Sequence, residues 1–293
     1  MELFFQLIID GLASGAIYAS LALALVLIFR ATHIVNFGQG EMATFSAYCA
    51  WQLCEWGVPI PLSFVVVGAA SFLLGIFVFR AVVRPISKAP VEAIVVVTLG
   101  LFVSFQALCL WVWGADQRAF PSMFPSDGWD ILGVRVTASV LGILLVLGCL
   151  AAAIGGIFRL TRLGLAMRAS AYSSEKSLLV GIPVEKMLML GWGFAATIGF
   201  IAAVLVGPRL FLSPTMMMSI LLYALASATL GGWDSPLGAV LGGLLVGVAE
   251  SLGATFLPFI GADLRVVIPI AVTLAILLVR PAGLFGTATV VKV

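Results

Sequence analysis

The sequence predicts an all-α protein, a polytopic bundle of about eight or nine helices that span a membrane. First, the 293-residue chain is 62% hydrophobic and only 10% charged, whereas soluble domains are roughly 45–50% apolar and about 25% charged. Second, its apolar runs approach the length of about 20 residues that a helix needs to cross a bilayer. Third, proline, glycine and charged residues separate these runs.

Nine apolar runs are the candidate spans. They lie at 5–29, 37–56, 61–83, 91–113, 137–158, 187–207, 216–231, 237–257 and 264–280. The run 216–231 is short and polar residues interrupt 37–56, so each is a candidate for a broken or partly inserted helix. We expect all of them to form a single transmembrane domain over residues 1–293, with an ordered external loop at 114–136.

Lysine and arginine predict which loops face the cytoplasm, because cytoplasmic loops carry the excess of these residues. If the loop 159–186 faces the cytoplasm and successive loops alternate between the two sides of the membrane, 11 of the 15 basic residues lie inside and 4 outside. The side of the N-terminus stays open, because it depends on whether 37–56 crosses. The inside residues are Arg30, Arg80, Arg84, Lys88, Arg159, Arg162, Arg168, Lys176, Lys186, Arg280 and Lys292, and the outside residues are Arg118, Arg135, Arg209 and Arg265.

Several functional classes are disfavoured by missing motifs. None of the four lysines follows a glycine, so the chain has no Walker A loop for ATP. No basic cluster is interleaved with aromatic residues, so nothing indicates nucleic acid as a partner. The four cysteines stand at irregular spacing without a C-x-x-C pair and are interpreted as core residues rather than metal ligands. We expect neither a catalytic centre nor a cofactor in this chain.

Residues 36–41, with the sequence Asn-Phe-Gly-Gln-Gly-Glu, interrupt an apolar stretch with polar groups. Glycine weakens a helix, and unwound backbone at membrane depth is tolerated only where protein or a water-filled cavity surrounds it. One interpretation is a polar element that lines a translocation path. The alternative is a short cytoplasmic turn that places Glu41 in a first helical turn, where negative charge is favourable. The residues alone do not decide between these two interpretations.

Other spans also carry polar side chains. Glu250 lies midway along 237–257 without a basic neighbour in that run. A carboxylate there is costly, so it should face the bundle interior, pair with another helix or be protonated; a structural hydrogen bond is the alternative to a pathway role. Thr98, Ser104 and Gln106 place a similar polar stripe on 91–113. The predicted substrate path is lined by Asn36, Gln39, Glu41, Thr98, Gln106 and Glu250.

The loop 159–186 differs from its apolar surroundings, with five basic residues against two acidic ones. A helix that begins near Thr161 would place Leu163, Ala166, Met167 and Ser170 on one face at a spacing of three to four residues, with Arg162 and Arg168 off that face. Such a helix fits either a groove on a soluble protein or an anionic lipid surface. We favour the protein groove, because the apolar face is small and alanine-rich. The chain would then be a transporter subunit driven from outside itself.

Several stretches together resemble the permease subunits of branched-chain amino acid importers of the ATP-binding-cassette class, specifically the smaller of the two permeases. The resemblance covers nearly the whole chain. The matching stretches are Gly11-Leu12-Ala13-Ser14-Gly15-Ala16-Ile17-Tyr18-Ala19, Asn36-Phe37-Gly38-Gln39-Gly40-Glu41-Met42, 164–183 with Arg168-Ala169 and Gly181-Ile182, Leu230-Gly231-Gly232-Trp233-Asp234-Ser235-Pro236-Leu237-Gly238-Ala239, 247–250 and Val279-Arg280-Pro281-Ala282-Gly283-Leu284-Phe285-Gly286.

The resemblance implies a multi-pass protein of the bacterial inner membrane with several partners. These are a second, related permease, two cytoplasmic ATPases that bind ATP and Mg, and a periplasmic solute-binding protein. The family often has histidine where Gln39 stands and glycine where Asp234 stands, so the solute is left open among branched-chain amino acids, urea, amides and carboxylates. The residues implied in coupling to the ATPases are Arg162, Gly164, Met167, Arg168, Ser170 and Glu175.

Two other classes of function compete with this interpretation. An ion-coupled secondary transporter would use Glu41 and Glu250 as proton carriers. The chain shows no convincing inverted repeat, which disfavours it. A purely structural membrane subunit is the other possibility, and it would bind neither an ATPase nor a solute receptor.

Overall fold

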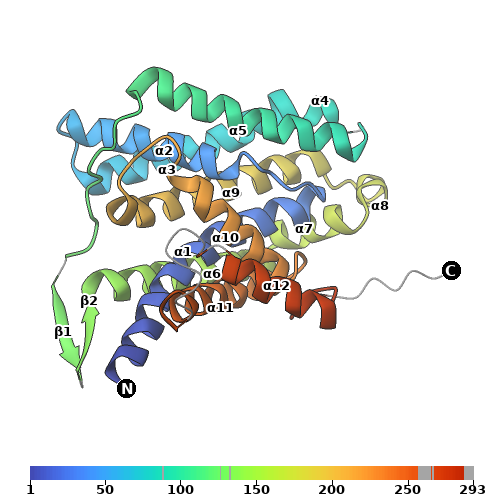
Figure 1. Ribbon diagram of the computed structural model, residues 1–293. Helices are drawn as coiled ribbons and strands as arrows, with labels where there is room; N and C mark the ends of the chain where they lie inside the picture. The colour runs from blue at the N-terminus through green and yellow to red at the C-terminus, as the bar shows by residue number, and fades with distance from the viewer. Residues whose placement is uncertain (88, 126, 132, 257–264, 266, 287–293) are drawn as a thin grey trace. The chain divides into compact units, whose positions relative to one another are not determined.

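A computed structural model of the chain describes residues 1–87, 89–125, 127–131, 133–256, 265 and 267–286 (Figure 1). Lys88 and Lys292, which enter the charge count above, lie outside the described residues. So do residue 257, at the end of one predicted span, and residue 264, at the start of another.

The described chain is almost entirely helical, which confirms the predicted all-α bundle. Each of the nine predicted spans contains a helix of the described chain, and six of these helices are long and apolar enough to cross a membrane. The elements are α1 Glu2–Thr32, α2 Gln39–Glu55, α3 Ile60–Val78, η1 Phe79–Val83, α4 Arg84–Ile86, α5 Val91–Trp113, β1 Gly128–Ile131, β2 Val134–Thr137, α6 Ala138–Leu160, α7 Arg162–Tyr172, α8 Ser174–Leu179, α9 Val184–Leu210, α10 Met216–Gly231, α11 Pro236–Phe256 and α12 Val267–Val279.

Proline and glycine set several helix boundaries. Pro59, Pro90 and Pro183 stand immediately before α3, α5 and α9. Proline suits these positions, because it lacks the N–H that a helix start leaves unpaired and its φ angle is already fixed. The helix α5 ends at Gly114, whose φ of 80° lies in the left-handed region that glycine adopts most readily.

Three segments are not full membrane spans or plain loops. The helix α2 has only 17 residues and α10 only 16, which at about 1.5 Å per residue makes each shorter than the roughly 30 Å hydrocarbon core. The expected external loop 114–136 contains a β-hairpin, in which β1 pairs antiparallel with β2 and Gly128 lies opposite Thr137. Strands of four residues are too short to produce a recognisable alternation of apolar and polar residues.

The described chain divides into two compact units. Unit 1 comprises Met1–Val26, Phe124–Ala151 and Leu222–Val293. In it, α1 crosses α11 through small residues. A Cβ atom added to Gly15 would lie 2.7 Å from the carbonyl oxygen of Gly243. The physical basis of this contact is that small residues let helices approach closely in lipid.

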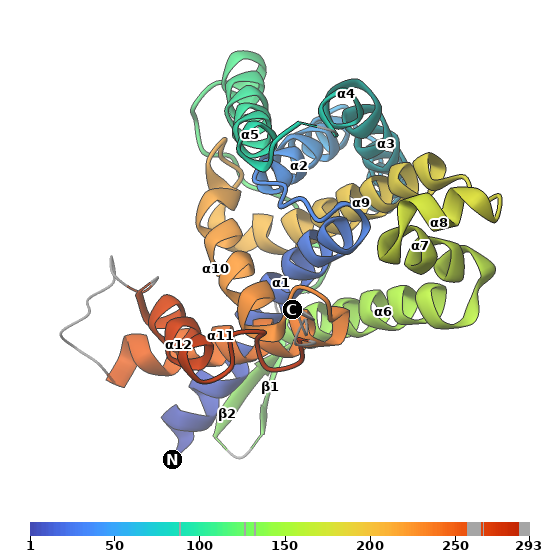
Figure 2. The same cartoon turned by 90° about the vertical axis from the view of Figure 1, so that its right-hand side faces the viewer.

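Unit 2 comprises Leu27–Met123 and Ala152–Leu221. Its central element is α9, which packs against α2, α3 and α7, as Figure 2 shows. Trp192 and Phe200 of α9 are among the largest fully buried side chains of the described chain. The helix α2 also packs against α3 and α5. This places the start of α2, with its polar residues, inside the packed part of the unit.

Candidate functional site

The polar segment before α2 is buried and bonded internally. Asn36 and Gln39 are 0% exposed. The Asn36 side-chain amide donates to Oε1 of Gln39 at 3.2 Å, and the Gly38 backbone N–H donates to Oδ1 of Asn36 at 3.1 Å. The Gln39 amide donates across to the carbonyl oxygen of Ala195 on α9 at 2.8 Å. An exposed cytoplasmic turn would not show this burial, so the segment belongs to the interior of unit 2.

Glu41 is the most unusual member of this segment. Its side chain is 0% exposed, and neither carboxylate oxygen has a hydrogen-bond partner among the described residues. Buried polar atoms in proteins are almost always paired, and an unpaired buried carboxylate is costly in free energy. The first turn of α2 is held in place, since a Cβ atom on Gly40 would lie 3.3 Å from the carbonyl oxygen of Met217. Glu41 is therefore a candidate functional group.

The two path candidates on α5 have different surroundings. Thr98 is 0% exposed, but its hydroxyl donates to the carbonyl oxygen of Val95 in its own helix at 3.0 Å. Gln106 is half-buried. Next to it, the ring of Phe105 meets Phe45 of α2 edge-to-face at 5.6 Å. The structure thus places α5 against α2, while the Thr98 hydroxyl is already satisfied locally.

Glu250 belongs to unit 1, where it joins three helices. The Tyr18 hydroxyl of α1 donates to Oε2 of Glu250 on α11 at 2.7 Å. Tyr223 of α10 also bonds to Glu250, and its ring stacks on Tyr18 with centroids 4.5 Å apart. Of the three expected solutions for this carboxylate, the structure shows pairing with other helices. The sequence did not predict that both tyrosines contact Glu250, because the residues of one span do not indicate which distant helices that span meets.

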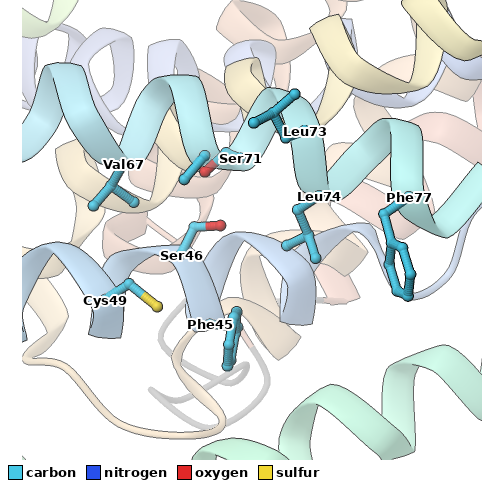
Figure 3. A pocket seen from close by; sticks show the side chains of 9 residues that line it. Phe45, Ser46, Cys49, Val67, Ser71, Leu73, Leu74 and Phe77 are labelled. Carbon is cyan, nitrogen blue, oxygen red and sulfur yellow. The ribbon is translucent and has the colours of Figure 1, made fainter.

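A groove between α2 and α3 is a second feature that the sequence did not reveal (Figure 3). Its volume is about 320 Å³, at the lower end of the range typical of small-molecule sites. Ser71 is 1% exposed, and its hydroxyl lacks a hydrogen-bond partner among the described residues. Phe45, one helical turn after Glu41, forms part of the wall. The lining residues are Phe45, Ser46, Cys49, Val67, Ala70, Ser71, Leu73, Leu74 and Phe77.

The helix α7 presents one face to its own chain. Gly164, Met167 and Ser170 are buried, and the predicted apolar face is the one that packs inward. The hydroxyl of Thr161 caps the helix by accepting from the Gly164 N–H at 3.0 Å. A Cβ atom on Gly164 would overlap the carbonyl oxygen of Ile157 in α6. These contacts fix the position of α7.

The other coupling candidates lie on the outer face of the same region. Arg162, Arg168 and Glu175 are exposed. Beside them the structure shows exposed apolar side chains that sequence reasoning missed, with Tyr172 89% and Leu179 86% exposed. The signal was present in the sequence as apolar residues within a polar loop. Exposed apolar groups rimmed by charges are typical of a protein-binding surface.

Comparison with known proteins connects these features to a family. Residues 7–277 match the family model described as "Branched-chain amino acid transport system / permease component". The chain is 27% identical to the high-affinity branched-chain amino acid transport system permease protein LivH of Salmonella typhimurium, with 99% of this chain and 98% of the relative covered. It is equally similar, at 27% identity and the same coverage, to the permease protein BraD of the corresponding Pseudomonas aeruginosa system. A probable LivH of Methanocaldococcus jannaschii is 26% identical, with 96% of this chain and 92% of the relative covered.

Proposed function

Because the chain belongs to the family of permease components of branched-chain amino acid transport systems, we propose that its solute is a branched-chain or other hydrophobic amino acid, or a related small polar solute. The chain is a multi-pass inner-membrane protein and a permease subunit of an ATP-binding-cassette transporter rather than an enzyme. The observation that carries this conclusion is the family match over 7–277, which includes all six helices long enough to span a membrane.

The partners that we propose follow from the outer face of α7 and α8. The surface formed by Arg162, Leu165, Arg168, Tyr172 and Leu179 combines positive charge with apolar side chains, all of them exposed. Such a combination fits a groove on a cytoplasmic ATPase, where aromatic and arginine side chains contribute most of the binding energy. Two ATPases, which bind ATP and Mg, would dock on this chain and on a second, related permease. A periplasmic solute-binding protein would deliver the solute.

The proposed path is lined, within unit 2, by the start of α2 together with α5. An amino acid carries an ammonium group, which a carboxylate attracts strongly in a site shielded from water. Glu41 suits this role because its two oxygens have no other partner among the described residues. Since Glu41 is fully buried, solute reaches it only after α2 and its neighbours move apart. ATP-driven movement of α7 would supply that motion through α9, on which α7 packs.

The competing function of an ion-coupled secondary transporter is not supported. The family and the curated relatives are described as permease components of transport systems, that is, as parts of multi-component assemblies. Glu250 is also occupied by two tyrosine hydroxyls, which is the arrangement of a structural hydrogen-bond network.

Purification of the intact assembly from native membranes tests the proposed function. We expect a sister permease and ATPase subunits to co-purify with this chain. In proteoliposomes, the assembly should take up leucine, isoleucine or valine when the receptor and ATP are supplied. The proposal is wrong if the purified chain alone transports solute on a proton gradient. A non-hydrolysable ATP analogue is the control, and it should leave uptake at background.

A further inference from the structure

Arg118 lies in the loop that follows α5, on the side of the membrane that the charge distribution assigns to the exterior. Its guanidinium carbon lies 4.5 Å from the ring centroid of Trp51 in α2. Its Nη2 atom donates to the carbonyl oxygen of Trp113, the last residue of α5, at 2.7 Å. The backbone of Arg118 pairs with that of Leu212 through two hydrogen bonds of 2.9 and 2.8 Å. The main chain and the guanidinium of Arg118 are therefore both held in place.

The positive charge of Arg118 has no ion-pair partner in the part of the chain that the structure describes. Its Nε atom is buried and lacks a hydrogen-bond partner among the described residues. An arginine side chain has several N–H donors, and in Arg118 only Nη2 donates to a described group. Buried donors without partners are rare, and the planar guanidinium matches the geometry of a carboxylate. The remaining donors of Arg118 therefore suit a carboxylate ligand.

A second donor without a partner lies beside Arg118. Tyr48 of α2 is 0% exposed, and its hydroxyl has no hydrogen-bond partner among the described residues. The Tyr48 ring stacks on Trp113 with centroids 4.8 Å apart, and Trp113 is also the residue whose carbonyl accepts from Arg118. The guanidinium is close enough to act electrostatically on the Tyr48 hydroxyl. A hydroxyl and a guanidinium, each with an unused donor, thus lie together next to Trp113.

The position of Tyr48 along α2 relates this pair to Glu41. Glu41, Phe45 and Tyr48 follow the spacing of four and three residues that places side chains on one face of a helix. Phe45 and Tyr48 both contact Trp113, so this face is turned toward α5, which packs beside α2 (Figure 2). At about 1.5 Å per residue, Tyr48 lies roughly 10 Å farther along the helix than Glu41. The two charged groups of one amino acid are closer together than that, so a solute would occupy the two places in turn.

We propose that Arg118 and Tyr48 bind the carboxylate of the amino acid at the external entrance of the α2–α5 interface, before its ammonium group reaches Glu41. This inference rests on the proposed function, because it requires an amino acid as the solute. The Nε atom of Arg118 and the Tyr48 hydroxyl are both buried, so the solute reaches them when α2 and α5 move apart. The hydroxyl then donates to one carboxylate oxygen and the guanidinium to the other.

Equilibrium binding of radiolabelled leucine to the purified assembly in nanodiscs, without the receptor, tests this inference. Leucinamide is the competitor, because it has an uncharged amide in place of the carboxylate. We expect the wild type to bind leucine about tenfold more tightly than leucinamide, the typical effect of one charge-assisted hydrogen bond. In Arg118→Gln this ratio should fall to about one, whereas a general loss of structure would weaken both ligands alike. The control Arg135→Gln removes an exposed arginine of β2 and should leave the ratio unchanged.

Tyr48→Phe provides a second test, which also serves if Arg118→Gln does not fold. It removes only the hydroxyl and keeps the ring that stacks on Trp113. We expect the ratio to fall about threefold, with an equal or higher thermal midpoint, because the lost group is buried without a partner. An unchanged ratio in either variant would overturn the inference, and so would an equal fall in Arg135→Gln.

Leucine uptake by the complete assembly, measured in parallel, separates this inference from the proposed function. If the wild type takes up leucine but binds leucine no more tightly than leucinamide, the carboxylate site is wrong and the proposed function stands. If the complete assembly takes up no amino acid, the proposed solute is wrong and the carboxylate site falls with it.

Discussion

The Glu41 carboxylate combines complete burial with two oxygens that lack partners among the described residues. A carboxyl group in this position destabilises the fold, because it is removed from water, whether charged or protonated, without a compensating hydrogen bond. Proteins retain such groups where function requires them. The neighbouring Asn36 and Gln39 show the opposite pattern, since both are bonded within the unit. They hold the segment in place, whereas we propose that Glu41 binds the solute once α2 and its neighbours move apart.

The variant Glu41→Gln distinguishes a solute-binding role of Glu41 from a structural one. Uptake should fall at least tenfold, because an amide does not attract an ammonium group as a carboxylate does. The thermal midpoint of the purified assembly should stay equal or rise, because the variant removes a buried ionisable group. The control is Glu55→Gln, at the exposed end of the same helix, which should leave both quantities unchanged. A lower thermal midpoint in Glu41→Gln would show that the carboxylate is structural.

Tyr18→Phe tests the network of unit 1. It removes the hydroxyl that donates to Glu250 at 2.7 Å while keeping the ring that stacks on Tyr223. We expect a loss of about 1–2 kcal/mol in stability, because a hydrogen bond to a carboxylate is lost. The measurement is the thermal unfolding midpoint of the detergent-solubilised chain. Tyr172→Phe, at an exposed position, is the control, and an identical midpoint in Tyr18→Phe and the wild type would contradict the network.

At the scale of elements, close contacts hold the inner face of α7 against α6, whereas the outer face of α7 is exposed. Gly164 allows the closest approach, since a Cβ atom there would lie within 2.5 Å of the Phe158 Cα atom in α6. The inner face of α7 carries Met167 and Ser170, which are both buried. A helix held on one side and exposed on the other can move as a rigid body when a partner pushes on it.

Gly164→Val should separate ATP hydrolysis from uptake. The added side chain overlaps α6, so α7 must shift away from it and transmit less motion to α9. We expect ATPase activity to persist in the assembly while ATP-dependent uptake falls at least fivefold, a conservative bound for a displaced coupling contact. The control is Gly155→Val in α6, where an added Cβ atom meets nothing within 4 Å. Normal uptake by Gly164→Val would contradict the role of α7.

The sequence predicted elements better than their contacts. Spans such as 91–113 were recognisable because length and composition alone distinguish a membrane helix, and α5 has these bounds. The helix after Thr161 was predicted from its period of three to four residues, and α7 begins at Arg162. The hairpin of β1 and β2 was not foreseen. Its strands have four residues each, too few to produce a recognisable alternation of apolar and polar residues.

The candidate site was predictable only in part. Glu41 and Glu250 stood out because charge is rare in apolar runs. Their surroundings did not follow from the sequence, because Tyr18 and Tyr223 reach Glu250 from helices far along the chain. The groove beside Ser71 was missed because most of its lining residues are apolar and resemble those that face lipid.

At the scale of the whole molecule, the chain has no nucleotide-binding loop of its own and belongs to a permease family matched over 7–277. We propose that the energy for transport comes from another subunit. An extensive polar stretch assigned to the cytoplasm is the loop 159–186, which contains α7 and α8.

Site-specific photo-crosslinking in the intact assembly tests most directly whether α7 and α8 receive mechanical input from an ATPase. A photoreactive amino acid is placed at Leu165 or Tyr172, both exposed on α7, and at Trp129 of the β-hairpin as the control. We expect crosslinks to the ATPase from Leu165 and Tyr172, with a yield that changes when ATP is added, and none from Trp129. Crosslinks from Trp129 alone, or none to a nucleotide-hydrolysing subunit from α7, would contradict the account.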